Sequence, residues 1–308
     1  MAQYIIRRLL QAILVIFGVL TVVFVILRLT GDPVRLMLGE NASEEAITSL
    51  NRELGLDRPL YVQYFAYMSK VARGDFGRSI AQGGKPALPI VLERYPATLQ
   101  LALLALTLSV TLATLFGIVS AIYRYSVFDN AAMFLALFGQ SVPNFWLGIM
   151  LILIFAVNLG WLPSQGSDGW NPRYFILPML TLAAPGLARL TRLVRSGMLD
   201  VLGQDYVRTA RAKGIQERRV VFGHALKNAA IPLVTIIGLD LGVLLGGAVV
   251  TEQIFEWPGV GRAVIEGINR RDFPVVQAAV FIIATSFVLI NLVVDLLYTW
   301  LDPRIRLG

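Results

Sequence analysis

The chain has 308 residues, of which 56% are hydrophobic and only 15% are charged, and its mean hydropathy is +0.68. This composition is too apolar for an ordinary soluble domain and indicates a membrane protein. The net charge is +7, but no basic run is interleaved with aromatic residues. We therefore expect no nucleic-acid partner.

The residue types also exclude several kinds of chemistry. The chain has no cysteine and one histidine, His224, so thiol catalysis, thiolate metal sites and a histidine metal cluster are excluded within it, and no metal site is expected. The sequence has no G-x-x-x-x-G-K-[ST], G-x-S-x-G or H-E-x-x-H motif. It therefore predicts no P-loop for ATP, no catalytic residue and no enzyme in this chain.

Six apolar stretches are candidates for crossing a bilayer, since a helix needs about 20 mostly apolar residues to do so. Five meet this length easily, whereas the fourth is shorter and contains Pro178 and Pro185. We expect its following arginines to reach the interface. The sequence thus predicts one all-α integral membrane domain over residues 1–308. Its six transmembrane helices are expected at about 9–29, 97–123, 131–159, 174–195, 229–251 and 275–301.

The distribution of Lys and Arg predicts the orientation, because cytoplasmic loops carry an excess of both. Six spans place both termini on one side of the membrane. Arg7, Arg8, Arg124 and the basic residues of 189–227 all fall on that side. We therefore expect both termini to be cytoplasmic.

The segment 30–96 is then a long external loop, and loops of this length largely escape the charge rule. Ser43 is a plausible N-cap for a first helix that ends at Gly55. A second helix is expected from near Pro59 to Gly74.

The segment 196–228 is the predicted cytoplasmic loop between the fourth and fifth spans. Asp205 is expected to cap a short helix that Gly214 ends, and a second short helix can follow as far as Phe222. Two short helices joined at a glycine form a rigid knob that could dock into a partner. The alternative is a solvated basic loop that only fixes the orientation.

Polar residues inside the spans are the candidates for a translocation pathway. Asp240 lies in the middle of the fifth span, where an ionised carboxylate is costly unless it faces water or a partner. It is either a contact for an amine of the substrate or a protonated, hydrogen-bonded structural group. It points away from Gly238, which starts a stripe of glycines repeated every four residues that continues with Gly242 and Gly246.

The third span contributes further candidates. Gln140 and Asn144 are four residues apart and are expected to share a helix face, with Ser141 nearby. They either line the pathway or bond to a neighbouring helix.

An external turn follows the fifth span. Trp257-Pro258-Gly259 has the turn pattern of proline followed by glycine. With Phe255, it is a candidate external gate or contact for a binding protein. The alternative is an anchor at the membrane interface.

One spacing is typical of a known family. Ala210-x-x-x-Gly214, followed after nine residues by His224-x-Leu226, resembles the cytoplasmic coupling loop of ABC importer permeases. The common motif has Glu where this chain has Arg208, and it ends near Leu-Pro where this chain has Lys227. These departures resemble the peptide and nickel branch of the family. Further segments similar to that branch are Gly31-Asp-Pro33, Leu54-Gly-Leu-Asp57, Pro59-Leu-Tyr61, Gly74-Asp-Phe-Gly77, Pro143-Asn-Phe-Trp146, Gly160-Trp-Leu-Pro163, Thr251 to Gly259 and Asp302-Pro-Arg304.

The resemblance is nearest to glutathione-import permeases. It implies a type I ABC importer permease fold and a permease subunit that forms half of the pathway for di- or oligopeptides or glutathione-like solutes in a bacterial inner membrane. The implied partners are a second homologous permease, two ATPase subunits that bind ATP and Mg, and an external solute-binding protein. The implied ATPase-coupling residues are Asp205, Tyr206, Arg208, Thr209, Ala210, Arg211, Ala212, Lys213, Gly214 and His224.

Three alternatives remain at this point. An ion-coupled secondary transporter would place its coupling ion on Asp240 or Asp295 and predicts inverted repeats, which the sequence does not show. A nickel or other small-solute importer of the same family shares every motif quoted above. A membrane scaffold would move no solute at all.

Overall fold

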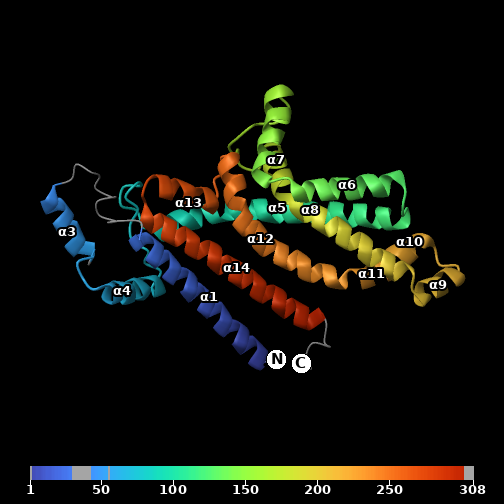
Figure 1. Cartoon of the computed structure of the whole chain (residues 1–308), viewed down its shortest axis with the longest axis horizontal. Coiled ribbons are helices and arrows are strands. Elements are labelled where there is room, and N and C mark those ends of the chain that lie inside the picture. Colours follow the sequence, from blue (N-terminus) through green and yellow to red (C-terminus); the bar gives the residue numbers. More distant parts are fainter. Residues whose placement is uncertain (1, 30–42, 55, 302–308) are drawn as a thin grey trace. The chain divides into compact units, whose positions relative to one another are not determined.

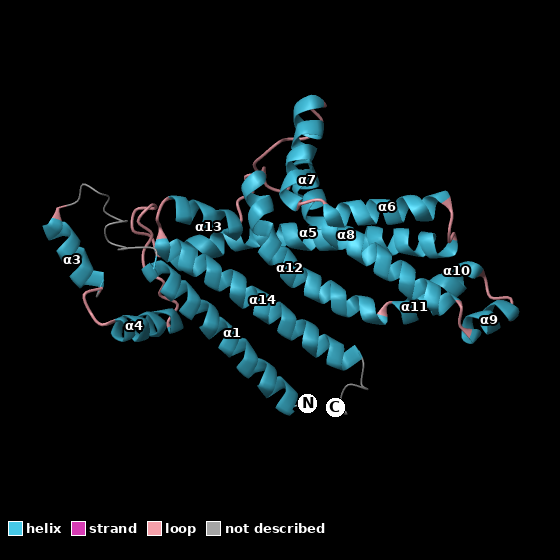
Figure 2. Cartoon of the chain, viewed as in Figure 1, coloured by secondary structure: helices cyan, strands magenta, loops and turns pink. Residues whose placement is uncertain are grey.

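The computed structural model describes residues 2–29, 43–54 and 56–301. Within these ranges the chain is helical, and the only β-type pairing is an isolated bridge between Arg78 and Pro86 (Figure 2). The chain forms two compact units. Unit 1 comprises residues 1–98 and 258–289, and unit 2 comprises 99–257 and 290–308.

Five of the described helices are long and apolar enough to cross a membrane, and a bent pair makes up to six. The prediction of an all-α membrane protein is confirmed. The five helices are α1 (Ala2–Leu29), α5 (Ala87–Ile122), α8 (Pro172–Leu202), α12 (Ile231–Ile254) and α14 (Phe273–Leu301) (Figure 1).

Helix α5 begins well before the predicted start at residue 97. Pro96 lies inside the helix and removes one backbone hydrogen bond. The preceding turns nevertheless stay helical, because Ala87 and Val91 are completely buried in the core of unit 1.

The third predicted span is not one continuous helix. It consists of α6 (Val127–Ser141) and α7 (Asn144–Leu151), which continues into a π-helix, η1 (Ile152–Asn158). The two halves are bent by 108°. Val142 is extended because a residue before proline is disfavoured in the helical region, and Pro143 then starts α7.

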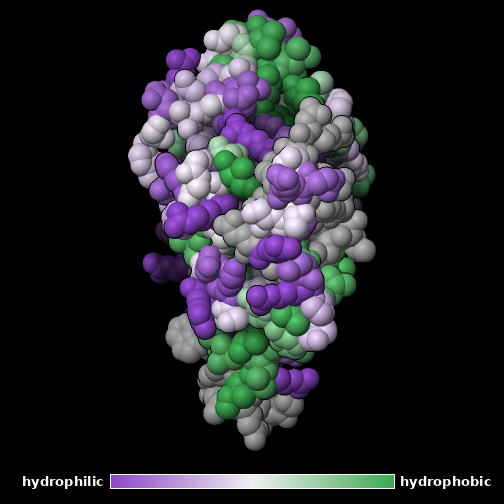
Figure 3. Space-filling model, turned by 90° about the vertical axis from the view of Figure 1, so that its left-hand side faces the viewer, coloured by the Kyte–Doolittle hydropathy of each residue, from purple (hydrophilic) through white to green (hydrophobic). Residues whose placement is uncertain are grey.

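Unit 1 contains the two helices predicted in segment 30–96. They are α3 (Glu44–Leu54) and α4 (Leu60–Ala72), whereas Gly55 and the motifs at 31–33 and 302–304 lie outside the described residues. Tyr64 of α4 bonds Thr21 of α1 at 2.8 Å between the hydroxyl oxygens. The face of the molecule in Figure 3 carries hydrophilic side chains beside hydrophobic ones, and α4 exposes the apolar Leu60 and Phe65.

The core of unit 1 also involves α13 (Val260–Asn269) and α14. Thr98 at the end of this part of α5 accepts a hydrogen bond of 2.8 Å from the backbone N–H of Val260, which fixes the start of α13. The buried apolar residues are Leu20, Val71, Phe76, Ala87, Ile90, Val91, Val260, Ala263, Val275, Ala278 and Ala279.

The core of unit 2 joins α5, α8 and the segment that follows α8. Gly117 of α5 lets α8 approach closely, because a Cβ there would lie 2.6 Å from Cβ of Val194. The buried apolar residues are Ala113, Ile118, Ala121, Leu190, Val194, Met198, Val221, Ala225, Ala229 and Leu233. This packing attaches segment 203–230 to the spans α8 and α12 on both sides.

Candidate functional site

Segment 203–230 forms a short helical hairpin, which we call the coupling hairpin. It contains α9 (Asp205–Ala212), α10 (Glu217–Arg219), the π-helix η2 (Val220–Ala225) and α11 (Leu226–Ala229). Gly214 ends the first helix with a φ of +72°, a conformation that favours glycine. The prediction that Asp205 is the N-cap of this helix is wrong. Gln204 is the N-cap residue and makes no side-chain capping bond, and Asp205 is the first residue of the helix.

The coupling hairpin has a small core of its own. Val207, Ala210 and Val220 are buried together against partly buried residues of α8 and Ile215. Tyr206 and Asn228 join the two ends, with 2.8 Å between the hydroxyl and the amide nitrogen. The predicted coupling residues therefore divide into buried Ala210, half-buried His224 and an exposed set. The exposed set is Asp205, Tyr206, Arg208, Thr209, Arg211, Ala212, Lys213 and Gly214.

An ion pair spans the glycine turn of the hairpin. Arg211 donates two hydrogen bonds, of 2.7 and 3.1 Å, to the carboxylate of Glu217. These bonds lower the pKa of Glu217 below its ordinary value, so the carboxylate is ionised at neutral pH. The ion pair thus links the two helices on either side of the turn at Gly214.

Helix α8 carries three arginines at three-residue intervals, and each bonds a neighbouring helix of unit 2. Arg189 pairs with Asp240 of α12, and Arg192 donates a hydrogen bond to Gln140 of α6. Two of the predicted pathway residues, Asp240 and Gln140, therefore lie beside arginines that the sequence reasoning assigned to the interface. The spacing of the arginines at positions 189, 192 and 195 within one predicted span was the sequence signal from which these contacts could have been predicted.

The predicted shared face of Gln140 and Asn144 is wrong. The bend at Val142 and Pro143 places Asn144 at the start of α7, on a different helix axis. Ser141 bonds only the backbone oxygen of Leu137 at 2.9 Å, one turn back in its own helix. Neither Ser141 nor Asn144 has a described side-chain contact with the arginines of α8.

The direction predicted for Asp240 is confirmed. Gly238 packs toward Val294 of α14, whereas Asp240 faces α8. One carboxylate oxygen of Asp240 bonds Arg189, and the other has no hydrogen-bond partner and lies near Gly186 and Ser109. The carboxylate is only 6% exposed, which agrees with a paired structural group.

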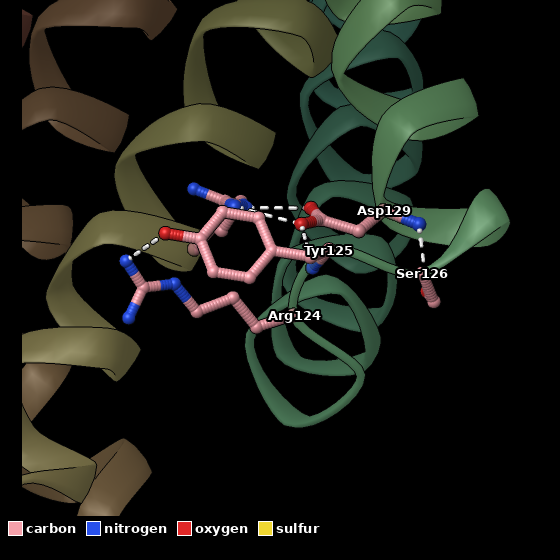
Figure 4. Close-up of polar contacts among 5 residues, drawn as sticks. Arg124, Tyr125, Ser126 and Asp129 are labelled. Carbon is pink, nitrogen blue, oxygen red and sulfur yellow. Dashed lines mark hydrogen bonds and ion pairs between the residues drawn. The ribbon is translucent and has the colours of Figure 1, made fainter.

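Asp129 organises the turn between α5 and α6 and ties it to α8 (Figure 4). Its carboxylate accepts two hydrogen bonds from Arg195, of 2.6 and 2.7 Å, and a third of 2.9 Å from the backbone N–H of Tyr125. Ser126 caps α6 by accepting the N–H of Asp129 at 3.1 Å. Asp129 is 1% exposed and Arg195 is 21% exposed, so the carboxylate of this ion pair is buried.

The residues of the predicted external gate lie mostly inside the protein. Phe255 and Trp257 are 2% and 1% exposed, and Gly259 is buried, so that Pro258 alone of the four is exposed. The ring of Trp257 packs edge-on against Phe175 of α8 with 4.7 Å between ring centres. The aromatic side chains therefore hold the end of α12 against α8.

Replacing Trp257 with alanine should consequently act on stability first. Loss of a fully buried aromatic side chain is expected to cost about 3–5 kcal/mol. Thermal unfolding of the detergent-purified protein measures it, with the exposed Pro258→Ala as the control that changes little. A Trp257→Ala protein of unchanged melting temperature would contradict this assignment.

Long apolar helices, a basic helical hairpin between two of them and charged groups paired within the spans are features of a multi-pass membrane protein. The sequence matches the binding-protein-dependent transport system inner membrane component over residues 113–307, and its N-terminal companion family over residues 1–111. The chain belongs to this family. It is a multi-pass transport subunit of a bacterial inner membrane and not an enzyme, and the predicted resemblance to ABC importer permeases is confirmed.

Two bacterial proteins are similar to this chain over nearly its full length. The glutathione transport system permease protein of Escherichia coli (strain K12) is 43% identical over 307 residues, which are 99% of each chain. The protein with the same description in Salmonella choleraesuis (strain SC-B67) is 44% identical over 308 residues, again 99% of each chain.

Two solved structures share the fold. A chain of the MetNI methionine ABC transporter superposes with a TM-score of 0.55 at 16% identity, over 69% of this chain and 96% of that one. A chain of an amino acid ABC transporter crystallised with histidines gives 0.51 at 18% identity, over 70% and 94%. The type of fold predicted for the chain is thus that of ABC importer permeases.

Proposed function

We propose that this chain is the permease subunit of an ATP-driven importer and forms half of the translocation pathway for peptides or glutathione-like solutes. The family and the glutathione transport permeases of 43–44% identity support this assignment. The observation that carries the mechanism is the coupling hairpin, which has its own core and an exposed basic surface.

The proposed assembly contains a second homologous permease, two ATPase subunits and an external solute-binding protein that delivers the cargo. ATP and Mg bind to the ATPase subunits, and this chain contributes no cofactor ligand. Both termini and the coupling hairpin lie in the cytoplasm in this proposal, because the basic residues Arg7, Arg8 and Arg124 fall on that side. Segment 30–96 is then external.

The coupling hairpin is proposed to transmit the movement of the ATPases. Its buried residues Val221, Ala225 and Ala229 pack with α8 residues such as Val194 and Met198 in one core. A rigid-body displacement of the hairpin would therefore carry α8 and α12 with it, and those two spans hold the paired Arg189 and Asp240. Reorientation of these helices opens the pathway to one side at a time.

Gly214 allows a test of this coupling. A β-branched residue at φ +72° costs about 1–2 kcal/mol, and the site has open space for a side chain, so the strain is in the backbone alone. Gly214→Val should reduce solute import per ATP hydrolysed by about tenfold, a barrier change of ~1.4 kcal/mol. Gly214→Asn is the matched control, because asparagine tolerates this conformation.

The assay compares ATP hydrolysis and uptake in proteoliposomes that contain this chain with its co-purifying partners. Equal coupling in the valine and asparagine variants would contradict the role of the hairpin. Uptake driven by an ion gradient in the absence of the ATPases would show that the chain is a secondary transporter and not part of an ATP-driven importer. Uptake of nickel but of no peptide would show that the chain belongs to a nickel importer of the same family.

A further inference from the structure

Arg189, Arg192 and Arg195 of α8 are not equally neutralised. Arg189 and Arg195 each pair with a carboxylate, those of Asp240 and Asp129. Arg192 bonds only the side-chain oxygen of Gln140, which is neutral, and its buried Nε has no partner. Within the part of the chain that the structure describes, no carboxylate pairs with Arg192. Among Arg189, Arg192 and Arg195, the positive charge of Arg192 is therefore the one left uncompensated.

Beside Arg192, one side of α8 carries exposed polar residues. Arg189 is 43% exposed at its side chain, and Ser196 and Asp200 are exposed further along the helix. At 100° of rotation per residue, Arg189, Ser196 and Asp200 lie within about 40° of one another around the helix axis. Gln140 on α6 is exposed next to the same stripe.

Such a face is unsuited to lipid. A charged side chain near the centre of the bilayer costs about 2.5–3.5 kcal/mol even on the lowest scales, so it normally faces water or protein. The exposed side of α12 is different, because Leu239, Val243 and Val250 make it apolar. The polar side of α8 is thus the side that faces water or protein in the membrane.

We infer that Arg192, positioned by Gln140, is the group of this chain that binds a carboxylate of the cargo inside the translocation pathway. This inference rests on the proposed function. A guanidinium binds a carboxylate through two parallel hydrogen bonds, and Gln140 occupies only part of its donor set. The cargo class is a solute with a free carboxylate, as peptides have. The same charge repels a bare divalent cation.

The absence of cysteine makes a direct test possible, since a single introduced thiol in this chain is unique. Gln140→Cys is placed beside Arg192 in the complete reconstituted transporter, with and without ATP. The thiol is then reacted with an anionic sulfonatoethyl and a cationic trimethylammonioethyl methanethiosulfonate. Labelling is measured on this chain after it has been separated from its partner subunits. Val243→Cys, on the apolar side of α12, is the control.

We expect the anionic reagent to react about tenfold faster at Gln140→Cys, because the guanidinium attracts it across a short distance. Adding Arg192→Gln should abolish this preference. S-methylglutathione, which has carboxylates and no thiol, should slow the labelling, whereas its diamide should not. Val243→Cys should react slowly with both reagents.

If Gln140→Cys fails to fold, Ser196→Cys, one turn from Arg192 on the same stripe, replaces it. Equal rates with both reagents would overturn the inference. Absence of labelling both with and without ATP would also overturn it and would assign this face to a contact with the second permease. Import by the unsubstituted transporter is measured in the same vesicles. Import that does not require ATP overturns the proposed function, whereas ATP-driven import without a charge preference overturns only the role of Arg192.

Discussion

Replacing Asp129 with alanine should lower the free energy of unfolding by about 3–5 kcal/mol, which is typical when one partner of a buried ion pair is removed. The substitution leaves Arg195 without its carboxylate, since both hydrogen bonds from its guanidinium end on Asp129. It also frees the backbone N–H of Tyr125 at a turn where Tyr125 has a φ of 64°. Thermal unfolding of the detergent-purified transporter measures the effect.

The matched comparison is Glu217→Ala in the coupling hairpin. Its carboxylate also accepts two hydrogen bonds from one arginine, but Arg211 and Glu217 are 43% and 55% exposed. An exposed pair contributes about 0–1 kcal/mol, so this variant should melt close to the unsubstituted protein. If the two variants lose equal stability, burial is not what makes the Asp129 pair strong.

Gly238→Ala should be the second strongly destabilising change. The added Cβ would overlap Cγ2 of Val294, and extra volume in a packed contact costs about 1–3 kcal/mol. Gly246→Ala is the control in the same helix and the same stripe of glycines, because a Cβ there meets nothing within 4 Å. Its melting temperature should stay the same or rise slightly.

A second substitution tests the assigned contact directly. Val294→Ala removes the methyl groups that a Cβ at residue 238 would meet. The double variant Gly238→Ala/Val294→Ala should therefore be more stable than the sum of the two single effects predicts. Simple additivity would show that Gly238 and Val294 do not contact each other in the membrane.

Sequence reasoning reached the fold and the coupling hairpin because local signals determine both. Long apolar runs can form only helices in a bilayer, since every backbone polar group must be bonded within the segment. The turn at Gly214 was predictable in the same way, because a glycine after a short amphipathic helix is a common helix end. The cap at Asp205 was misplaced by one residue.

The polar cluster was only partly predictable. Asp240 and Gln140 stood out as polar residues in apolar spans, but their partners Arg189 and Arg192 are 51 and 52 residues away in the chain. The arginines also had a sufficient explanation at the membrane interface. The positions of Phe255 and Trp257 in the sequence predicted an external role, whereas both side chains are buried and Trp257 packs against Phe175 of α8.

The sequence by itself determined the class of protein, the helical spans and the hairpin between α8 and α12, because hydrophobicity, loop charge and glycine conformation act over a few residues at a time. The tertiary structure alone decided the bend of the third span into α6 and α7, the contact of Gly238 with α14 and the unequal neutralisation of the arginines. These features depend on which helices pack against each other in the folded protein. That choice is made by packing between segments far apart in the chain.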